Sequence, residues 1–111
     1  MLGFNKKEPE PTLDEQIIVA LKTVQDPELG VNVWDLGLIY QIKIPASRFV
    51  VIDMTLTSPG CPAAGILPGQ VARAAKAVPG VAGVSLNLVW DPPWSAARVS
   101  REGRWLMNYG R

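Results

Sequence analysis

Two neighbouring stretches, residues 38–44 and 49–57, alternate between apolar and more polar side chains and constrain the fold of this chain most. Side chains of a strand point alternately to its two faces, so each stretch predicts a strand with one apolar face. The apolar positions are Leu38, Tyr40, Ile42 and Ile44 in the first stretch and Val50, Ile52, Met54 and Leu56 in the second. The opposite face of the second carries Asp53, Thr55 and Thr57. Because residues 45–48 form only a short connection, we expect an antiparallel hairpin that helices cover on one side.

Helical spacing of apolar residues occurs on both sides of this hairpin. Thr12 and Glu15 fit a capping box, and the pattern after them predicts a helix to about Gln25, stopped by Pro27. A second helical pattern follows residue 61, with a kink or a restart expected at Pro68, where a regular helix would be destabilised by about 3 kcal/mol. The apolar faces are Leu13, Ile17, Ala20, Leu21 and Val24 in the first helix and Leu67, Val71, Ala74, Ala75 and Val78 in the second.

A third strand, over residues 84–90, and a last short helix capped by Ser95 or Ser100 complete the predicted elements. The fold class is α/β (α+β): a compact two-layer α-β-β-α-β-α domain with a three-stranded sheet and a right-handed strand–helix–strand crossover. Residues 1–11 are expected to form a flexible N-terminal tail and residues 12–111 a single domain. The pattern leaves open whether the third strand lies beside the first or the second.

Composition excludes several classes of partner. The chain has 111 residues, enough for one domain, and a net charge of +1, which argues against nucleic acid or an anionic membrane as partner. Four arginines near the C-terminus are expected on a solvated helix face rather than a partner surface. No apolar run approaches the roughly 20 residues of a membrane span. The first ten residues lack the apolar core of a signal peptide, and a lone cysteine suits a reducing cytosol, so we expect a cytoplasmic protein.

Cys61, the only cysteine, is the strongest candidate for chemistry. Pro62 fits the first position of a helix, which would place Cys61 at the cap, facing unpaired amides and the positive end of the helix dipole. Such placement lowers the pKa of a thiol, and the thiolate is both the nucleophile and the metal ligand. The alternative is a small buried apolar residue. The chain has no histidine, so a Cys–His or Ser–His–Asp arrangement is excluded, and one chain cannot complete a four-ligand zinc or iron–sulfur site.

Other candidates have weaker signals. Asp26 and Glu28 bracket Pro27 and are either solvated loop carboxylates or a pair facing a metal or partner near Cys61. Thr57 either hydrogen-bonds a thiolate or an anion, or reflects strand propensity on a half-exposed face. That second interpretation explains Thr55 better. Three further residues are interpreted structurally: Asp35 caps a turn more readily than it joins the site, Trp90 fills the core, and Trp94 covers a pocket or joins an interface.

Four segments together resemble one family. They are Asp26-Pro27-Glu28, Asp35-Leu36-Gly37-Leu38-Ile39-Tyr40, Met54-Thr55-Leu56-Thr57-Ser58-Pro59-Gly60-Cys61-Pro62 and Val89-Trp90-Asp91-Pro92-Pro93-Trp94. In order and spacing the chain resembles the SufT/PaaD-like family of metal–sulfur cluster assembly domains from about Thr12 to Leu106. The PaaD branch usually carries a cysteine-rich C-terminal extension, and because this chain has none, it is more similar to the stand-alone SufT-like branch.

The resemblance implies an iron–sulfur-assembly-type domain that acts as an accessory factor, not an enzyme, and helps iron or clusters reach target apoproteins. It implies one pocket bordered by Asp26, Glu28, Thr57 and Cys61. Cys61 would hold iron or a cluster transiently, with the assembly machinery, a client apoprotein or a second protomer of a homodimer supplying the other ligands; no cofactor bound stably by one chain is expected. The alternatives are a peroxidase-like thiol redox protein that uses Cys61 and a non-catalytic binding or adaptor domain.

Overall fold

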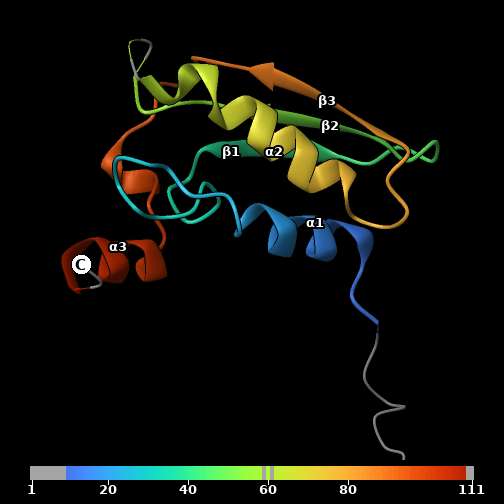
Figure 1. Cartoon of the computed structure of the whole chain (residues 1–111), viewed down its shortest axis with the longest axis horizontal. Coiled ribbons are helices and arrows are strands. Elements are labelled where there is room, and N and C mark those ends of the chain that lie inside the picture. Colours follow the sequence, from blue (N-terminus) through green and yellow to red (C-terminus); the bar gives the residue numbers. More distant parts are fainter. Residues whose placement is uncertain (1–9, 59, 61, 110–111) are drawn as a thin grey trace, which may run out of the picture.

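The computed structural model describes residues 10–58, 60 and 62–109 of the chain, and its elements follow the predicted order (Figure 1). The helices are α1 (Leu13–Leu21), α2 (Leu67–Lys76) and α3 (Arg101–Tyr109), and the strands are β1 (Ile39–Lys43), β2 (Phe49–Met54) and β3 (Gly83–Leu88). Two short 3-10 turns, η2 (Pro62–Gly65) and η3 (Ala96–Arg98), precede α2 and α3. The prediction of a small α-β-β-α-β-α domain with a three-stranded sheet is confirmed.

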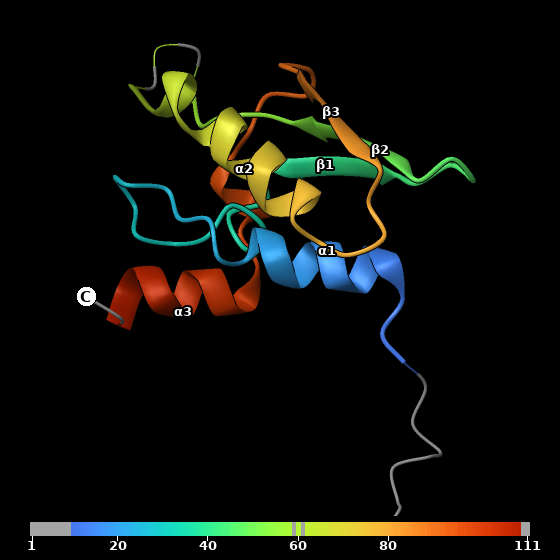
Figure 2. The same cartoon turned by 45° about the vertical axis from the view of Figure 1, so that its right-hand side comes forward.

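Strand β2 lies at the centre of the sheet, antiparallel to β1 and parallel to β3, which answers the question that the sequence left open. The register places Ile42 and Leu86 on either side of Ile52, so the three share one face. Residues 50, 52 and 54 of β2 are fully buried there, as their spacing predicts. Helices α1 and α2 cover this face, as the turned view in Figure 2 shows, and both contribute fully buried side chains to the core.

Helix α1 begins as predicted and ends earlier. Thr12 and Glu15 form the expected capping box. The helix stops at Leu21 instead of about Gln25. The N–H groups of residues 23 and 24 donate to the carbonyl three positions earlier instead of four, as Val24 N–H does to Leu21 O at 3.1 Å. The chain then reverses, with Gln25 pairing antiparallel to Asn32. The helix end predicted from the spacing was wrong. Val24 fits the apolar spacing because it is buried, but it lies beyond the helix.

Helix α2 restarts at Pro68, as predicted. The chain passes through η2, and α2 then begins at Leu67, so that Pro68 falls in the first turn. The first four N–H groups of a helix have no partner within it, so proline forfeits no hydrogen bond here and the expected cost of about 3 kcal/mol does not arise. The predicted face of the helix is buried through Leu67, Val71 and Ala75.

Two predictions about single side chains were wrong. Thr55 was expected on a half-exposed face but is fully buried, because the chain continues past β2 beside residue 38 and Thr55 N–H donates to Leu38 O at 2.8 Å. Trp90 was expected in the core but is 41% exposed, since it follows β3 at the edge of the sheet, where the last strand residue, Leu88, is also exposed. Trp94 is partly buried against the core, and its indole N–H donates to Leu36 O at 2.6 Å.

Among the described residues, none of the helices combines the length and apolarity that crossing a membrane requires.

Candidate functional site

Asp26 shapes the loop that follows α1. Its side chain is almost fully buried, and Oδ1 accepts hydrogen bonds from the N–H groups of Glu28 at 2.7 Å and Leu29 at 3.0 Å. Its carbonyl oxygen accepts from Gly30 N–H at 2.8 Å, where a backbone φ of 72° suits glycine. The carboxylate of Asp26 therefore holds its own turn and is not a solvated loop carboxylate, one of its two predicted alternatives.

Two backbone hydrogen bonds close the base of the loop that carries Asp26 and Glu28. Asp26 N–H donates to Val31 O at 3.0 Å, and Val33 N–H donates to Val24 O at 2.9 Å. These bonds make a short hairpin-like loop of residues 24–33, with the exposed Glu28 near its tip. Glu28 is thus presented outward by a loop whose backbone is held at several points.

Thr57 is half-buried just beyond β2, directly after the buried Leu56. Cys61 lies outside the described residues. In both views, the loop after α1 and the described part of the segment between β2 and α2 lie at the same end of the molecule. Leu29 of the loop and Ala64 of η2 also pack against the same core. The predicted pocket of Asp26, Glu28, Thr57 and Cys61 therefore stays a prediction, with its described members on segments at one end of the fold.

The carboxylate of Asp35 connects the turn before β1 to the start of α3. It is 5% exposed, and its two carboxylate oxygens accept from Asn32 Nδ2 at 2.8 Å and from Ser100 Oγ at 2.6 Å. Burial acts to raise the pKa of Asp35, but the hydrogen bonds from Ser100 and Asn32 and the charge of Lys22 outweigh it and lower the pKa from its ordinary value. Asp35 thus remains an anion. Its backbone N–H donates to Asn32 Oδ1 at 2.9 Å, so the side chain that caps this turn is that of Asn32 and not, as predicted, that of Asp35.

Ser100 is the partner that sequence reasoning missed at Asp35. Its N–H donates to Asp35 O at 2.8 Å, and its hydroxyl also accepts from Gly103 N–H at 3.0 Å, which makes it the cap of α3. The capping role of Ser100 was one of two predicted alternatives, but nothing in the sequence pairs it with a residue 65 positions away.

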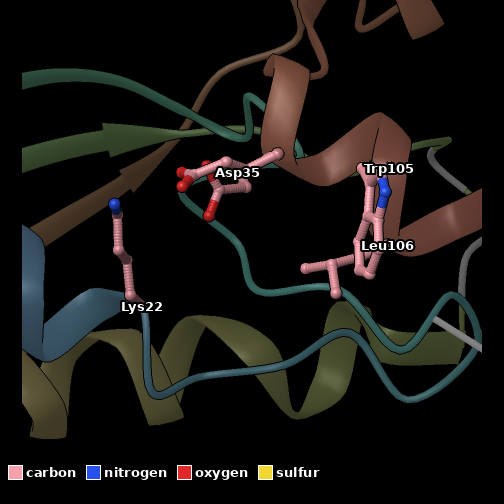
Figure 3. A pocket seen from close by; sticks show the side chains of 5 residues that line it. Lys22, Asp35, Trp105 and Leu106 are labelled. Carbon is pink, nitrogen blue, oxygen red and sulfur yellow. The ribbon is translucent and has the colours of Figure 1, made fainter.

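A cleft of about 390 Å³ lies beside Asp35 (Figure 3). Its lining residues are Lys22, Asp35, Glu102, Trp105 and Leu106. They come from the end of α1, the turn before β1 and the helix α3. No sequence pattern indicates this cleft, because it forms only where these three distant segments meet.

The described residues contain no group of three or more acidic, cysteine or histidine side chains able to hold a metal ion.

Comparison with known proteins defines the class of this chain. The model of the iron–sulfur cluster assembly protein family matches residues 14–86, so the chain belongs to that family. A crystal structure of a domain of unknown function (DUF59) from Bacillus anthracis superposes with a TM-score of 0.82 at 38% identity, covering 87% of this chain and 92% of that one. The resemblance inferred from the four sequence segments and the fold class are thereby confirmed.

Individual relatives carry functional names. The Fe-S protein maturation auxiliary factor of Porphyromonas gingivalis is 45% identical over 89 residues, which cover 80% of this chain and 85% of the relative. The Fe-S protein maturation auxiliary factor YitW of Bacillus subtilis is 42% identical over 92 residues, covering 83% of this chain and 90% of the relative. The Fe-S protein maturation auxiliary factor SufT of Staphylococcus aureus is 38% identical over 78 residues, or 70% of this chain and 89% of the relative.

Proposed function

We propose that this protein is an accessory factor in the maturation of iron–sulfur proteins that helps deliver iron or clusters to target apoproteins and catalyses no reaction of its own. One observation carries the proposal: relatives 42–45% identical over four fifths of the chain are named Fe-S protein maturation auxiliary factors. Membership of the iron–sulfur cluster assembly family supports the same role. The proposed partners are the assembly machinery and client apoproteins.

Cys61 is the proposed ligand for the cargo. A thiolate is the ligand that iron–sulfur clusters use in proteins, and carboxylates such as those of Asp26 and Glu28 also bind iron. Asp26 is held by two backbone N–H groups, which supports a loop of fixed shape beside the cargo. Thr57 would donate a hydrogen bond to the thiolate or to a cluster sulfide.

A single thiolate leaves the coordination of the cargo incomplete. A client protein, an assembly protein or a second copy of this chain would supply the remaining ligands. Incomplete coordination binds weakly and releases readily, as transfer to a client requires.

Anaerobic reconstitution with ferrous iron and sulfide tests direct binding of the cargo. We expect sulfur-to-iron charge-transfer absorbance that Cys61→Ser abolishes and Ser58→Ala leaves in place. Equal absorbance in the wild type and Cys61→Ser would contradict the ligand role of Cys61. Turnover of peroxide with a thiol reductant, dependent on Cys61, would instead support the redox alternative.

A further inference from the structure

The cleft beside Asp35 has one charged end and one apolar end. Figure 3 shows Lys22 and Asp35 on one side of the opening and Trp105 and Leu106 on the other. Trp105 is 57% exposed and Leu106 is 37% exposed, so both side chains of the apolar end reach solvent. Its volume of about 390 Å³ lies within the range of about 300–1,000 Å³ that ligand pockets span.

The wall that α3 contributes is fixed to the rest of the domain. Ser100 donates to Asp35 through both its N–H and its hydroxyl. A Cβ added at Gly103 would lie 2.9 Å from Asp35 O, so the first turn of α3 rests directly on the backbone of Asp35. Arg104 is also held, since its Nε–H donates to Val99 O at 3.2 Å. The cleft therefore exists before a ligand arrives, and binding would not have to order it.

The charges that line the cleft favour a cationic ligand. The cleft is lined by two carboxylates, those of Asp35 and Glu102, and by a single ammonium group, that of Lys22. The exposed indole of Trp105 adds an aromatic face, which attracts cations and packs well against aliphatic groups. Tryptophan is also over-represented among the residues that dominate binding at protein interfaces.

We propose that this cleft docks a basic–apolar segment of a partner protein. An arginine or lysine side chain would pair with the carboxylates that line the cleft, and a neighbouring aliphatic side chain would lie against Trp105 and Leu106. The inference rests on the proposed function only for the identity of the partner, which would be a client or carrier of the maturation pathway.

Amide and indole chemical shifts of the full-length 15N-labelled protein test the docking. The probe is the acetylated, amidated peptide Leu-Arg-Leu-Arg, and its neutral control is Leu-Gln-Leu-Gln. We expect the arginine peptide to shift the Trp105 indole and Gly103 amide signals saturably, with a dissociation constant on the order of 1 mM. No saturable shift, or equal binding of the neutral peptide, would overturn the proposal.

Two variants localise the binding. Glu102→Gln should weaken binding up to about fivefold, as expected for an exposed ion pair, and Trp105→Ala by about tenfold or more. Glu10→Gln removes the same charge before α1, at the other end of that helix from Lys22, and should bind the peptide as the wild type does. Equal weakening by Glu10→Gln and Glu102→Gln would show only a net-charge effect and overturn the proposal. Shifts at Trp105 that follow protein concentration without peptide would assign the cleft to a second copy of the chain and also overturn it.

Complementation in the source cell separates failure of this inference from failure of the proposed function. If deleting the gene lowers the activity of an iron–sulfur enzyme, the Trp105→Ala variant should restore less activity than Glu10→Gln at equal protein levels. Full rescue by Trp105→Ala would overturn the docking role and leave the maturation role standing. A deletion without any effect would instead contradict the proposed function.

Discussion

At the scale of single residues, Asp35 combines burial, charge and a complete set of hydrogen bonds. Replacing it by asparagine keeps the shape but removes the charge that Ser100 and Asn32 hydrogen-bond. Hydrogen bonds to charged groups contribute about 1.5–3 kcal/mol each, and an amide retains part of this. We expect Asp35→Asn to lower the free energy of unfolding by about 1–3 kcal/mol, measured by urea denaturation.

Asp53 provides the matched control for this substitution. Its carboxylate also accepts from an asparagine, Asn87 Nδ2 at 3.0 Å, but on an exposed part of the sheet. Asp53→Asn should therefore change stability by less than about 1 kcal/mol. Equal effects of the two substitutions would show that burial of Asp35 does not matter.

Asp35 also predicts how stability depends on pH. Its pKa in the folded protein lies below the ordinary value of 3.8, so its contribution is fully present above that value. The contribution is lost as pH falls from about 4 through the lower pKa of the folded state. We expect the stability difference between wild type and Asp35→Asn to shrink over this window in urea unfolding at successive pH values. A difference that stays constant or grows toward low pH would contradict this assignment.

At the scale of elements, we expect the same glycine-to-alanine substitution to change the free energy of unfolding in opposite directions in two helices. A Cβ at Gly69, in the first turn of α2, would meet only Arg73 Nη1 at 3.6 Å. Gly69→Ala should therefore raise the free energy of unfolding by about 0.5–1 kcal/mol, since alanine loses less backbone entropy in a helix.

Gly103→Ala in α3 is the contrasting substitution. Its Cβ would lie 2.8 Å from Val99 Cγ1 and 2.9 Å from Asp35 O, so it should destabilise the protein by roughly 1–3 kcal/mol. Urea denaturation of both variants measures whether each substitution raises or lowers the free energy of unfolding. Stabilisation by both would show that α3 does not rest on Asp35 as described.

Local sequence signals predicted the starts of elements better than their ends. Thr12, Ser100 and Pro68 mark helix starts through local rules of capping and proline geometry, so a short window of sequence is sufficient. The end of α1 depends on the reversal that pairs Gln25 with Asn32, a contact outside any helical pattern. The exposure of Trp90 likewise depends on β3 being an edge strand, and spacing along one strand cannot reveal its neighbours.

At the scale of the whole molecule, the C-terminal segment joins the domain through close backbone contacts at Gly37. Its φ is 77°, and a Cβ there would lie 2.4 Å from Arg98 O. Gly37→Ala should lower the free energy of unfolding by at least about 2 kcal/mol, because strained backbone adds to this overlap. Hydrogen exchange should accelerate most at Ser100 N–H, which donates to Asp35 O.

Gly65→Ala is the control, because a Cβ at Gly65 has no atom within 4 Å and its φ is not left-handed. It should leave the exchange of Ser100 N–H unchanged. If the Ser100 N–H of Gly37→Ala exchanges at the same rate as in the wild type, the contact between residues 37 and 98 is contradicted.

The overall fold class followed from the sequence, whereas the arrangement of distant segments did not. Alternation and helical spacing were sufficient for the order of elements, and the four motif segments together were sufficient for the family. The position of β3 and the contact of Ser100 with Asp35 depend on packing between segments far apart in the chain, which no local pattern encodes. The predicted pocket depends in addition on Cys61, which lies outside the described residues.

The central claim is a maturation role that depends on Cys61, and one measurement in the source cell tests it most directly. The gene is deleted, and the activity of an iron–sulfur enzyme per unit of its protein is assayed under iron limitation, with wild type or Cys61→Ser restored at equal levels. We expect deletion to lower the activity and only the wild type to restore it. Unchanged activity after deletion would contradict the maturation role, and full rescue by Cys61→Ser would contradict the role of the thiol.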